Sequence, residues 1–272
     1  MLDLMIPPIA AGLVILSIHV YLGLHVIARG VIFVDLAFAQ IAALGATAGF
    51  LMGVDHDTPL SLALSVGFTL VGALIFSFSR LEETVVPQEA VIGIIFVVAS
   101  AAVILIAGFT AEGAEHIAET LTGTLIWVAW PQIIRMAVVY TVLGVIYYIF
   151  RKPLLSVSLG EKSPRARAWD FLFYVLFGIV ISLSVPVAGV LMVFSSLVMP
   201  AVVAFLFTSR FSAALWIAWG VGAVALVTGV VASFRWDIPT GPLLVCTFGL
   251  AVVIGMLIRF VAGVRPGSVL QP

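Results

Sequence analysis

Long apolar runs separated by short polar stretches occupy almost the whole chain. Each run has about 16 to 24 residues, close to the roughly 20 that an α-helix needs to cross the hydrocarbon core of a bilayer. The runs are continuously apolar and do not alternate, so they predict membrane-spanning helices and not half-buried strands. They cover residues 6–28, 31–53, 60–79, 90–109, 132–150, 169–184, 187–207, 212–233 and 239–262.

Two places in this pattern leave the number of spans at eight or nine. Only SVPVAG separates the runs 169–184 and 187–207, and its Pro186 and Gly189 favour either a tight hairpin or one kinked helix. The stretch LTGTLIWVAWP at 121–131 is too short to cross and suits a half-helix or re-entrant segment. We therefore predict an all-α, polytopic integral membrane protein with eight or nine transmembrane helices plus a short re-entrant or half-helix.

The composition agrees with this class and excludes several others. Of 272 residues, 63% are hydrophobic and 9% are charged, and the mean hydropathy is +1.30, which a soluble domain with a charged surface does not show. The net charge of -1 offers no basic surface for nucleic acid. The single cysteine, Cys246, excludes a disulfide framework and a cysteine metal cluster. G-x-S-x-G, H-E-x-x-H and C-x-x-C motifs are absent from the sequence, so we do not expect an enzyme.

The positions of the basic residues predict the orientation of the chain, because Lys and Arg beside short loops favour the cytoplasmic side. Nine spans with an external N-terminus place most of the basic residues in the cytoplasm, whereas eight spans would put part of them on the wrong side. The cytoplasmic set is Arg29, Arg80, Arg151, Lys152, Lys162, Arg165, Arg167, Arg210, Arg259 and Arg265.

The largest predicted cytoplasmic loop is RKPLLSVSLGEKSPRARAW at 151–169, in which Glu161 is the single acid. One interpretation is an anchor at the level of the lipid headgroups. The other is a docking element for a soluble partner. Its GEKS resembles part of a phosphate-binding loop but lacks the first glycine and the required spacing, so we expect no nucleotide to bind by that route.

Two polar residues interrupt the second apolar run, in the segment VDLAFAQIAALG at 34–45. They are Asp35 and Gln40. A carboxylate inside a membrane is costly unless it is paired, hydrated or neutralised, so such residues usually mark a pathway or a specific partner. Five positions on a helix correspond to about 140° of rotation, so the two side chains do not share one narrow face.

Polar residues in the predicted external segments are candidate cation ligands. In AEGAEHIAETLTG at 111–123 they recur at helical spacing and form either a transient cation site or an ordinary solvated face. These residues are Glu112, Glu115, His116 and Glu119.

Asp237 begins the turn DIPTGP, which we expect to be a rigid, non-helical entry to the last span. There Asp237 either caps the following helix or meets an arriving cation. Two histidines, His19 and His25, lie on different faces of the first span, so they cannot bind one ion together. We expect one of them to line a path and the other to make an interhelical hydrogen bond.

Five stretches, in order along nearly the whole chain, resemble the membrane permeases of ATP-binding-cassette importers for zinc, manganese and iron. They are GLHVIARGVIFVDLAFAQIAALG at 23–45, EAVIGIIF at 89–96, LTGTLIWV at 121–128, VAGVLMVFSSLVMPAVVA at 187–204 and FRWDIPTGP at 234–242. The glycine-led helix that ends in M-P-A and the turn D-x-P-x-G-P are the most specific of these motifs.

The resemblance implies a single transmembrane permease domain over residues 1–272, in the cytoplasmic (inner) membrane of a prokaryote. It implies three partners: a cytoplasmic ATPase subunit that uses ATP, an extracytoplasmic metal-binding receptor protein and a second permease chain in a homodimer. The chain itself would bind no cofactor and no nucleic acid, and the transported metal ion would be zinc, manganese or iron.

The resemblance also implies candidate residues for the metal path. The family's second span reads D-x-x-x-H-x-x-x-x-G, and counting back from Gly45 puts Gln40 at the histidine position and Leu36 at the aspartate position. The acid is displaced to Asp35, and Thr124 stands where an acid usually follows LTG. A glutamine amide suits hard cations better than zinc. The candidates for the path or its mouth are Gln40, Asp35, His116, Glu115, Glu119 and Asp237.

Two other functions compete with this interpretation. A secondary transporter of a cation or small solute, driven by an ion gradient, would use Asp35 and Glu89 as titrating groups. A membrane scaffold without transport would use its polar residues only to join helices. The basic loop favours the importer, and the lack of a continuous series of membrane carboxylates argues against the secondary transporter.

Overall fold

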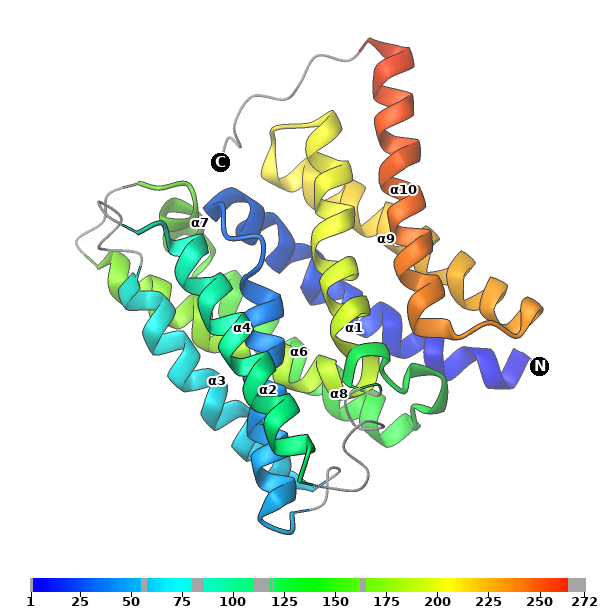
Figure 1. The fold of residues 1–272 in the computed structure, drawn as a ribbon. Helices are drawn as coiled ribbons and strands as arrows, with labels where there is room; N and C mark the ends of the chain where they lie inside the picture. The colour runs from blue at the N-terminus through cyan, green and yellow to red at the C-terminus, as the bar shows by residue number, and fades with distance from the viewer. Residues whose placement is uncertain are drawn as a thin grey trace. The chain divides into compact units, whose positions relative to one another are not determined.

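The computed structural model describes residues 2–54, 58–79, 86–109, 118, 120–161 and 165–263. Its regular elements in these residues are all helical, as Figure 1 shows. They are α1 Leu2–Arg29, α2 Val34–Leu51, α3 Pro59–Ser79, α4 Gln88–Ala107, the 3₁₀ turn η1 Leu125–Trp127, α6 Trp130–Ile149, α7 Arg151–Ser158, α8 Ala166–Phe207, α9 Phe211–Trp236 and α10 Thr240–Ala262.

Eight helices in the described residues are long and apolar enough to cross a membrane: α1, α2, α3, α4, α6, α8, α9 and α10. The prediction of an all-α polytopic membrane protein is therefore confirmed. The apolar stretch 121–131, which the sequence marks as too short to span, has helical backbone at Leu121 and Thr122 and then the three-residue turn η1, and α6 begins at Trp130.

Helix α8 contains both of the runs that the sequence separates at SVPVAG. It has 42 residues, or about 63 Å at 1.5 Å per residue, roughly twice the thickness of a hydrocarbon core. The helical backbone is broken at Gly189, whose φ of 74° and ψ of 157° are far from helical values. The sequence thus places the break correctly, three residues after Pro186.

The chain divides into two compact units. The first unit comprises Met1–Arg29, Thr124–Gly160 and Leu191–Pro272, and the second comprises Gly30–Gly123 and Glu161–Val190. The division passes through α8 one residue after Gly189, so the two parts of this helix belong to different units.

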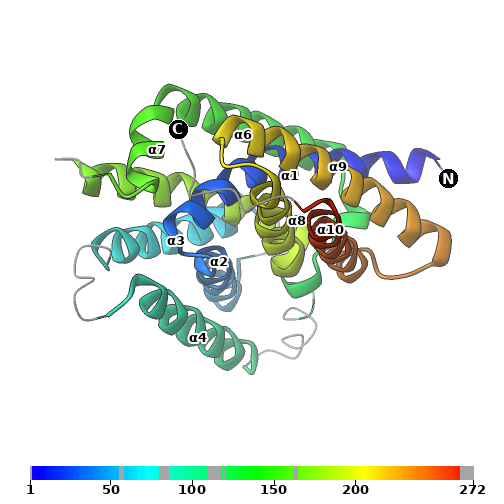
Figure 2. The same cartoon turned by 90° about the horizontal axis from the view of Figure 1, so that it is seen from above.

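In the second unit α2 packs against both α3 and α4, as the two views in Figures 1 and 2 show. The core of this unit is an aromatic cluster around Phe38, whose ring centre lies 5.2 Å from that of Phe76 and 5.4 Å from that of Phe177. Small residues bring the backbones close: a Cβ atom on Gly178 would lie 3.0 Å from the Cβ of Thr69. Close packing at small residues is the usual way in which membrane helices associate, because lipid supplies no hydrophobic force between them.

In the first unit α1 packs against α6 and α9, and α9 packs against α10. Gly23 in α1 faces the carbonyl of Leu197 so closely that a Cβ atom there would collide with it. Gly222 in α9 makes room for the side chain of Leu16. α1 is thus held by neighbours on two sides.

Replacement of Gly45 by alanine should destabilise the second unit. A Cβ atom there would lie 2.8 Å from the carbonyl oxygen of Leu64 and 2.9 Å from the Cα of Ser65, and overpacking of this kind costs about 1–3 kcal/mol. Gly67→Ala in the neighbouring helix is the matched control, since its new methyl group would have no described atom within 4 Å. Thermal unfolding of the purified protein should show a lower midpoint for Gly45→Ala and an equal or higher one for Gly67→Ala. Equal midpoints for the two variants would contradict this packing of α2 on α3.

Candidate functional site

Helix α2 carries the two polar residues that the sequence singles out within the membrane. Asp35 is 1% exposed and Gln40 is 9% exposed. Asp35 lies in the first turn of the helix and Gln40 lies further along it, and most residues of α2 are buried. The two side chains have different surroundings.

Asp35 lies at the positive end of the α2 helix dipole. The first turn of a helix has free backbone N–H groups and stabilises a negative charge. Both carboxylate oxygens are sealed from solvent, and neither has a hydrogen-bond partner in the described part of the chain. Burial of a carboxylate without a partner disfavours its charged form, and the helix N-terminus offsets only part of that cost.

A second carboxylate reaches the same end of α2 from a neighbouring helix. Glu89 lies in the first turn of α4, and its Oε1 accepts a hydrogen bond of 3.4 Å from the backbone N–H of Phe33, the residue that caps α2. The adjacent Gln88 fixes the start of α4, because its Nε2 donates to the carbonyl of Phe76 at 2.9 Å and to the hydroxyl of Tyr174 at 3.0 Å. The acids of α2 and α4 thus gather at one helix terminus.

Gln40 differs from Asp35 because its amide keeps access to the surface. Its side chain makes no hydrogen bond with the described residues. The N and O atoms of its amide are not fully buried, whereas both carboxylate oxygens of Asp35 are. Gln40 is therefore the polar group of α2 that can exchange partners with water or an ion.

At the break in α8, the backbone of Gly189 packs directly against the backbone of Gly123. A Cβ atom on Gly123 would overlap the backbone of Ala188 and Gly189, and a Cβ on Gly189 would overlap the backbone of Thr122 and Gly123. Both glycines have positive φ, 72° for Gly123 and 74° for Gly189, which other residues rarely adopt. Irregular backbone at membrane depth is tolerated only where protein packs on it or where it lines a cavity.

The turn before α10 differs in part from its prediction. Asp237 is exposed and has a left-handed backbone with φ of 53°, and it ends α9. It does not cap α10, because Pro239 holds that position and the helix begins at Thr240, inside the segment predicted as non-helical. Ser233 closes the turn: its hydroxyl donates to the carbonyl of Ile238 at 2.6 Å and lies 2.7 Å from the hydroxyl of Thr240.

The remaining candidate ligands are not brought together by the described residues. Glu112, Glu115, His116 and Glu119 lie outside the described part of the chain. Among the residues that the structure describes, no three His, Cys, Asp or Glu side chains form a group that could hold a metal ion.

The first part of the predicted docking loop is a short helix, α7. Leu154, Val157 and Ser158 form its buried face, whereas Arg151 and Lys152 are exposed. The helix is thus amphipathic, with its charged face free to meet solvent, lipid or protein.

Ser158 joins α7 to the end of α1. Its hydroxyl donates to the carbonyl of Leu154 at 2.8 Å, so its oxygen can only accept from other groups. It accepts from Nε of Arg29 at 2.9 Å and is hydrogen-bonded to Nδ1 of His25 at 2.8 Å. His25 is therefore the interhelical histidine of the two in α1, since His19 bonds the carbonyl of Ile15 in its own helix at 2.7 Å.

A comparison with models of protein families shows which family the chain belongs to. Residues 1–259 match the model of the ABC 3 transport family. The chain belongs to the ABC 3 transport family. The match confirms the resemblance to permeases of ATP-binding-cassette importers, and it makes the chain a transport component.

Individual proteins are also similar to this chain. The chain is 24% identical over 219 residues to the manganese transport system membrane protein MntB of Synechocystis sp., covering 73% of this chain and 68% of MntB. It is 22% identical over 262 residues to the manganese import system permease protein ScaB of Streptococcus parasanguinis, covering 93% of this chain and 89% of ScaB.

A solved structure has the same fold. It is PsaBC from Streptococcus pneumoniae in complex with Fab, with a TM-score of 0.75 and 20% identity. The similarity covers 92% of this chain and 90% of the other. At 20% identity this similarity establishes the fold of the chain alone.

The sequence alone did not point to Ser158 or to the contact of Gly123 with Gly189. The signal for Ser158 was the spacing of Leu154, Val157 and Ser158, which is one face of a helix inside a loop that otherwise looked basic. Both glycines stood in motifs that carry the family resemblance, LTG and VAG, but backbone contact leaves no pattern of side chains to detect.

Replacement of Ser158 by alanine should loosen α7 from α1. Arg29 and His25 lose a shared acceptor in a buried site, and the loss of such a partner costs about 1–3 kcal/mol. Ser100→Ala is the matched control, because that hydroxyl bonds only the carbonyl of Phe96 in its own helix, at 2.7 Å. Limited proteolysis near residue 160 should be faster in Ser158→Ala than in the parent or in Ser100→Ala. Equal rates in all three would refute this role for Ser158.

Proposed function

We propose that this chain is the permease subunit of an ATP-driven importer for a hard divalent transition-metal ion, with Mn²⁺ as the preferred cargo. The observation that carries the proposal is the match of residues 1–259 to the ABC 3 transport family. Two relatives are named as a manganese transport system membrane protein, MntB, and a manganese import system permease protein, ScaB. The chain would act in the cytoplasmic membrane of a prokaryote, as a multi-pass protein.

The choice of metal rests on Gln40. Its amide oxygen is a hard, neutral ligand, and such ligands suit Mn²⁺ better than zinc, which prefers imidazole and thiolate. Because this amide keeps access to the surface within a mostly buried helix, it can bind a largely hydrated ion and release it again. Weak binding is an advantage in a path, because a tightly held ion would not leave.

Asp35 has a different part in the proposal. Its sealed carboxylate and that of Glu89 both lie at the start of α2, where the helix dipole favours negative charge. We assign Asp35 to the folding of the second unit and not to the path. Among the external candidates, exposed Asp237 remains a mouth ligand, together with Glu115, His116 and Glu119.

The partners follow from the division of labour that the family implies. The chain has no phosphate-binding loop of its own, so a cytoplasmic ATPase subunit would supply ATP hydrolysis. Its docking element would be α7, a short amphipathic helix whose buried face is fixed to α1 by Ser158. An extracytoplasmic receptor would deliver the metal ion, and a second copy of this chain would complete the path as a homodimer.

Uptake by proteoliposomes tests the function. A complex purified through a tag on this chain should contain a separate ATPase chain and should take up radioactive Mn²⁺ when ATP is supplied on the side of α7. A non-hydrolysable ATP analogue is the control and should support no uptake. An imposed proton gradient should drive no uptake into liposomes that hold this chain alone. Gradient-driven uptake by the lone chain would overturn the proposal in favour of a secondary transporter.

Substitutions in α2 separate the two polar residues. Gln40→Ala should lower Mn²⁺ uptake per molecule roughly tenfold, the lower end of the losses seen when a group beside a metal is removed. Gln40→His should shift preference from manganese toward zinc. Asp35→Ala should reduce the amount of assembled protein and leave uptake per molecule nearly unchanged.

Gln88→Ala is the matched control for Gln40→Ala. It removes the same kind of side chain from a site where the amide has structural partners, so it should lower the protein yield and not the uptake per molecule. If Asp35→Ala abolishes uptake per molecule while Gln40→Ala does not, Asp35 is the path ligand and the assignment of Gln40 to the path is wrong.

A further inference from the structure

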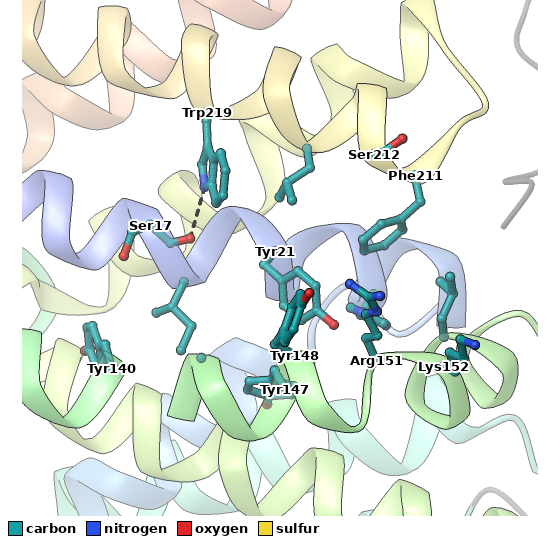
Figure 3. A pocket seen from close by; sticks show the side chains of 15 residues that line it. Ser17, Tyr21, Tyr140, Tyr147, Tyr148, Arg151, Lys152, Phe211, Ser212 and Trp219 are labelled. Atoms are coloured by element: carbon teal, nitrogen blue, oxygen red, sulfur yellow. Dashed lines mark hydrogen bonds between the residues drawn. The ribbon is translucent and has the colours of Figure 1, made fainter. Parts of the chain in front are cut away.

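A groove of about 640 Å³ lies within the first unit, between α1, α6 and α9. Figure 3 shows α1 crossing its centre, with side chains from α6 on one side and from α9 on the other. Ser17 and Tyr140 lie toward one end in this view, and Arg151 and Lys152 lie at the opposite end. None of the residues proposed for the metal path lines it.

The length of the groove matches half a membrane. Its lining residues extend from Ser17 to His25 on α1, from Tyr140 to Tyr148 on α6 and from Phe211 to Trp219 on α9. Eight positions along a helix correspond to about 12 Å, and one leaflet contributes about 15 Å of hydrocarbon. The groove is therefore as long as most of one lipid tail.

The wall of the groove is mainly aromatic and aliphatic. The ring centre of Tyr21 lies 5.4 Å from that of Tyr147 and 5.7 Å from that of Phe211, so these rings form a continuous apolar surface. At the end of the groove near Ser17, Nε1 of Trp219 donates a hydrogen bond to the carbonyl of Ser17 at 3.0 Å. Because the indole N–H is already hydrogen-bonded, a molecule bound in the groove does not have to supply an acceptor for it. This environment suits a hydrocarbon chain.

The other end of the groove carries positive charge. Arg151 and Lys152 are exposed and line it, and its lining includes no Asp or Glu. In the described part of the chain neither cation forms an ion pair with a carboxylate. The guanidinium of Arg151 lies 4.4 Å from the ring centre of Tyr148, which holds it at the mouth with its N–H groups available.

The orientation predicted from the basic residues would put this basic end on the cytoplasmic side, where anionic lipids are found. Basic pockets between spanning helices on that side are the usual sites for acidic lipid headgroups. Arginine matches a phosphate by paired hydrogen bonds, and lysine adds a point charge. Tyrosine is enriched at the same depth because its ring is apolar and its hydroxyl is polar.

We propose that the groove between α1, α6 and α9 binds one anionic phospholipid, with an acyl tail along the apolar length and the phosphate against Arg151 and Lys152. The positive charges of Arg151 and Lys152 favour an acidic headgroup. The apolar length of the groove favours a lipid over a free phosphate, which has no acyl tail to fill it. Since α7 begins with these two residues, the bound lipid rests against the helix that we propose for ATPase docking.

The test uses the complex purified in detergent, stripped of lipid and supplied with either phosphatidylglycerol or phosphatidylcholine. Native mass spectrometry should show one phosphatidylglycerol retained per copy of this chain, and phosphatidylcholine should be retained far less. The double variant Arg151→Gln with Lys152→Gln should weaken this retention roughly tenfold or more. The matched control is Arg167→Gln with Arg259→Gln, which removes the same charge from residues outside the groove. Equal loss in both double variants would overturn the proposal.

A second pair of variants tests the apolar part. Gly144 lines the groove and has nothing within 4 Å of its missing side chain, so Gly144→Leu should fill the groove without disturbing its own helix. Gly249→Leu is the control, since that position is equally open and lies outside the groove. Retention of phosphatidylglycerol should fall in Gly144→Leu and persist in Gly249→Leu.

Two results would assign the groove to another occupant. Undiminished retention in Gly144→Leu would mean that the mouth alone binds the headgroup or a free phosphate, and the lipid site would be refuted. A change in the number of permease chains per complex, with lipid retention unaltered, would mean that the groove receives a second copy of the chain.

Discussion

Backbone hydrogen bonding inside hydrocarbon is the constraint on which this structure depends. Every N–H and C=O at membrane depth needs a partner within the protein, so a break in a spanning helix must be covered by other backbone or line a cavity. At the break in α8, the backbone of Thr122 and Gly123 packs directly against Gly189, so the irregular segment is covered by protein. Without that break, a helix of 42 residues would be about twice as long as the membrane is thick.

The same constraint explains where the polar side chains lie. Gln88 bonds a carbonyl of α3 and a hydroxyl of α8, and Ser158 bonds two side chains of α1, so each of these groups joins neighbouring helices. Asp35 lies in the first turn of α2, and both of its carboxylate oxygens are buried without a partner among the described residues. Gln40 differs from all of them, because it is polar, lies within a span and keeps access to the surface without a partner among the described residues.

The sequence predicted the helices well and the contacts between them poorly. Apolar runs report membrane spans directly, and Pro186 with Gly189 limited the break in α8 to a few residues. The contact of Gly123 with Gly189 could not be predicted, because two residues without side chains leave no pattern. The turn at Asp237 was predicted as longer than it is, since Pro242 is tolerated in the first turn of α10 and does not delay the helix.

Gln40 and Asp35 divide the roles of path ligand and structural carboxylate in the proposed importer, and the transported ion itself can distinguish them. The most direct measurement is the anomalous scattering of Mn²⁺ in crystals of the complex held before ATP hydrolysis. We predict a peak beside the amide oxygen of Gln40, with most of the remaining ligands supplied by water. A peak against the carboxylates of Asp35 or Glu89, with none beside Gln40, would contradict this division of roles.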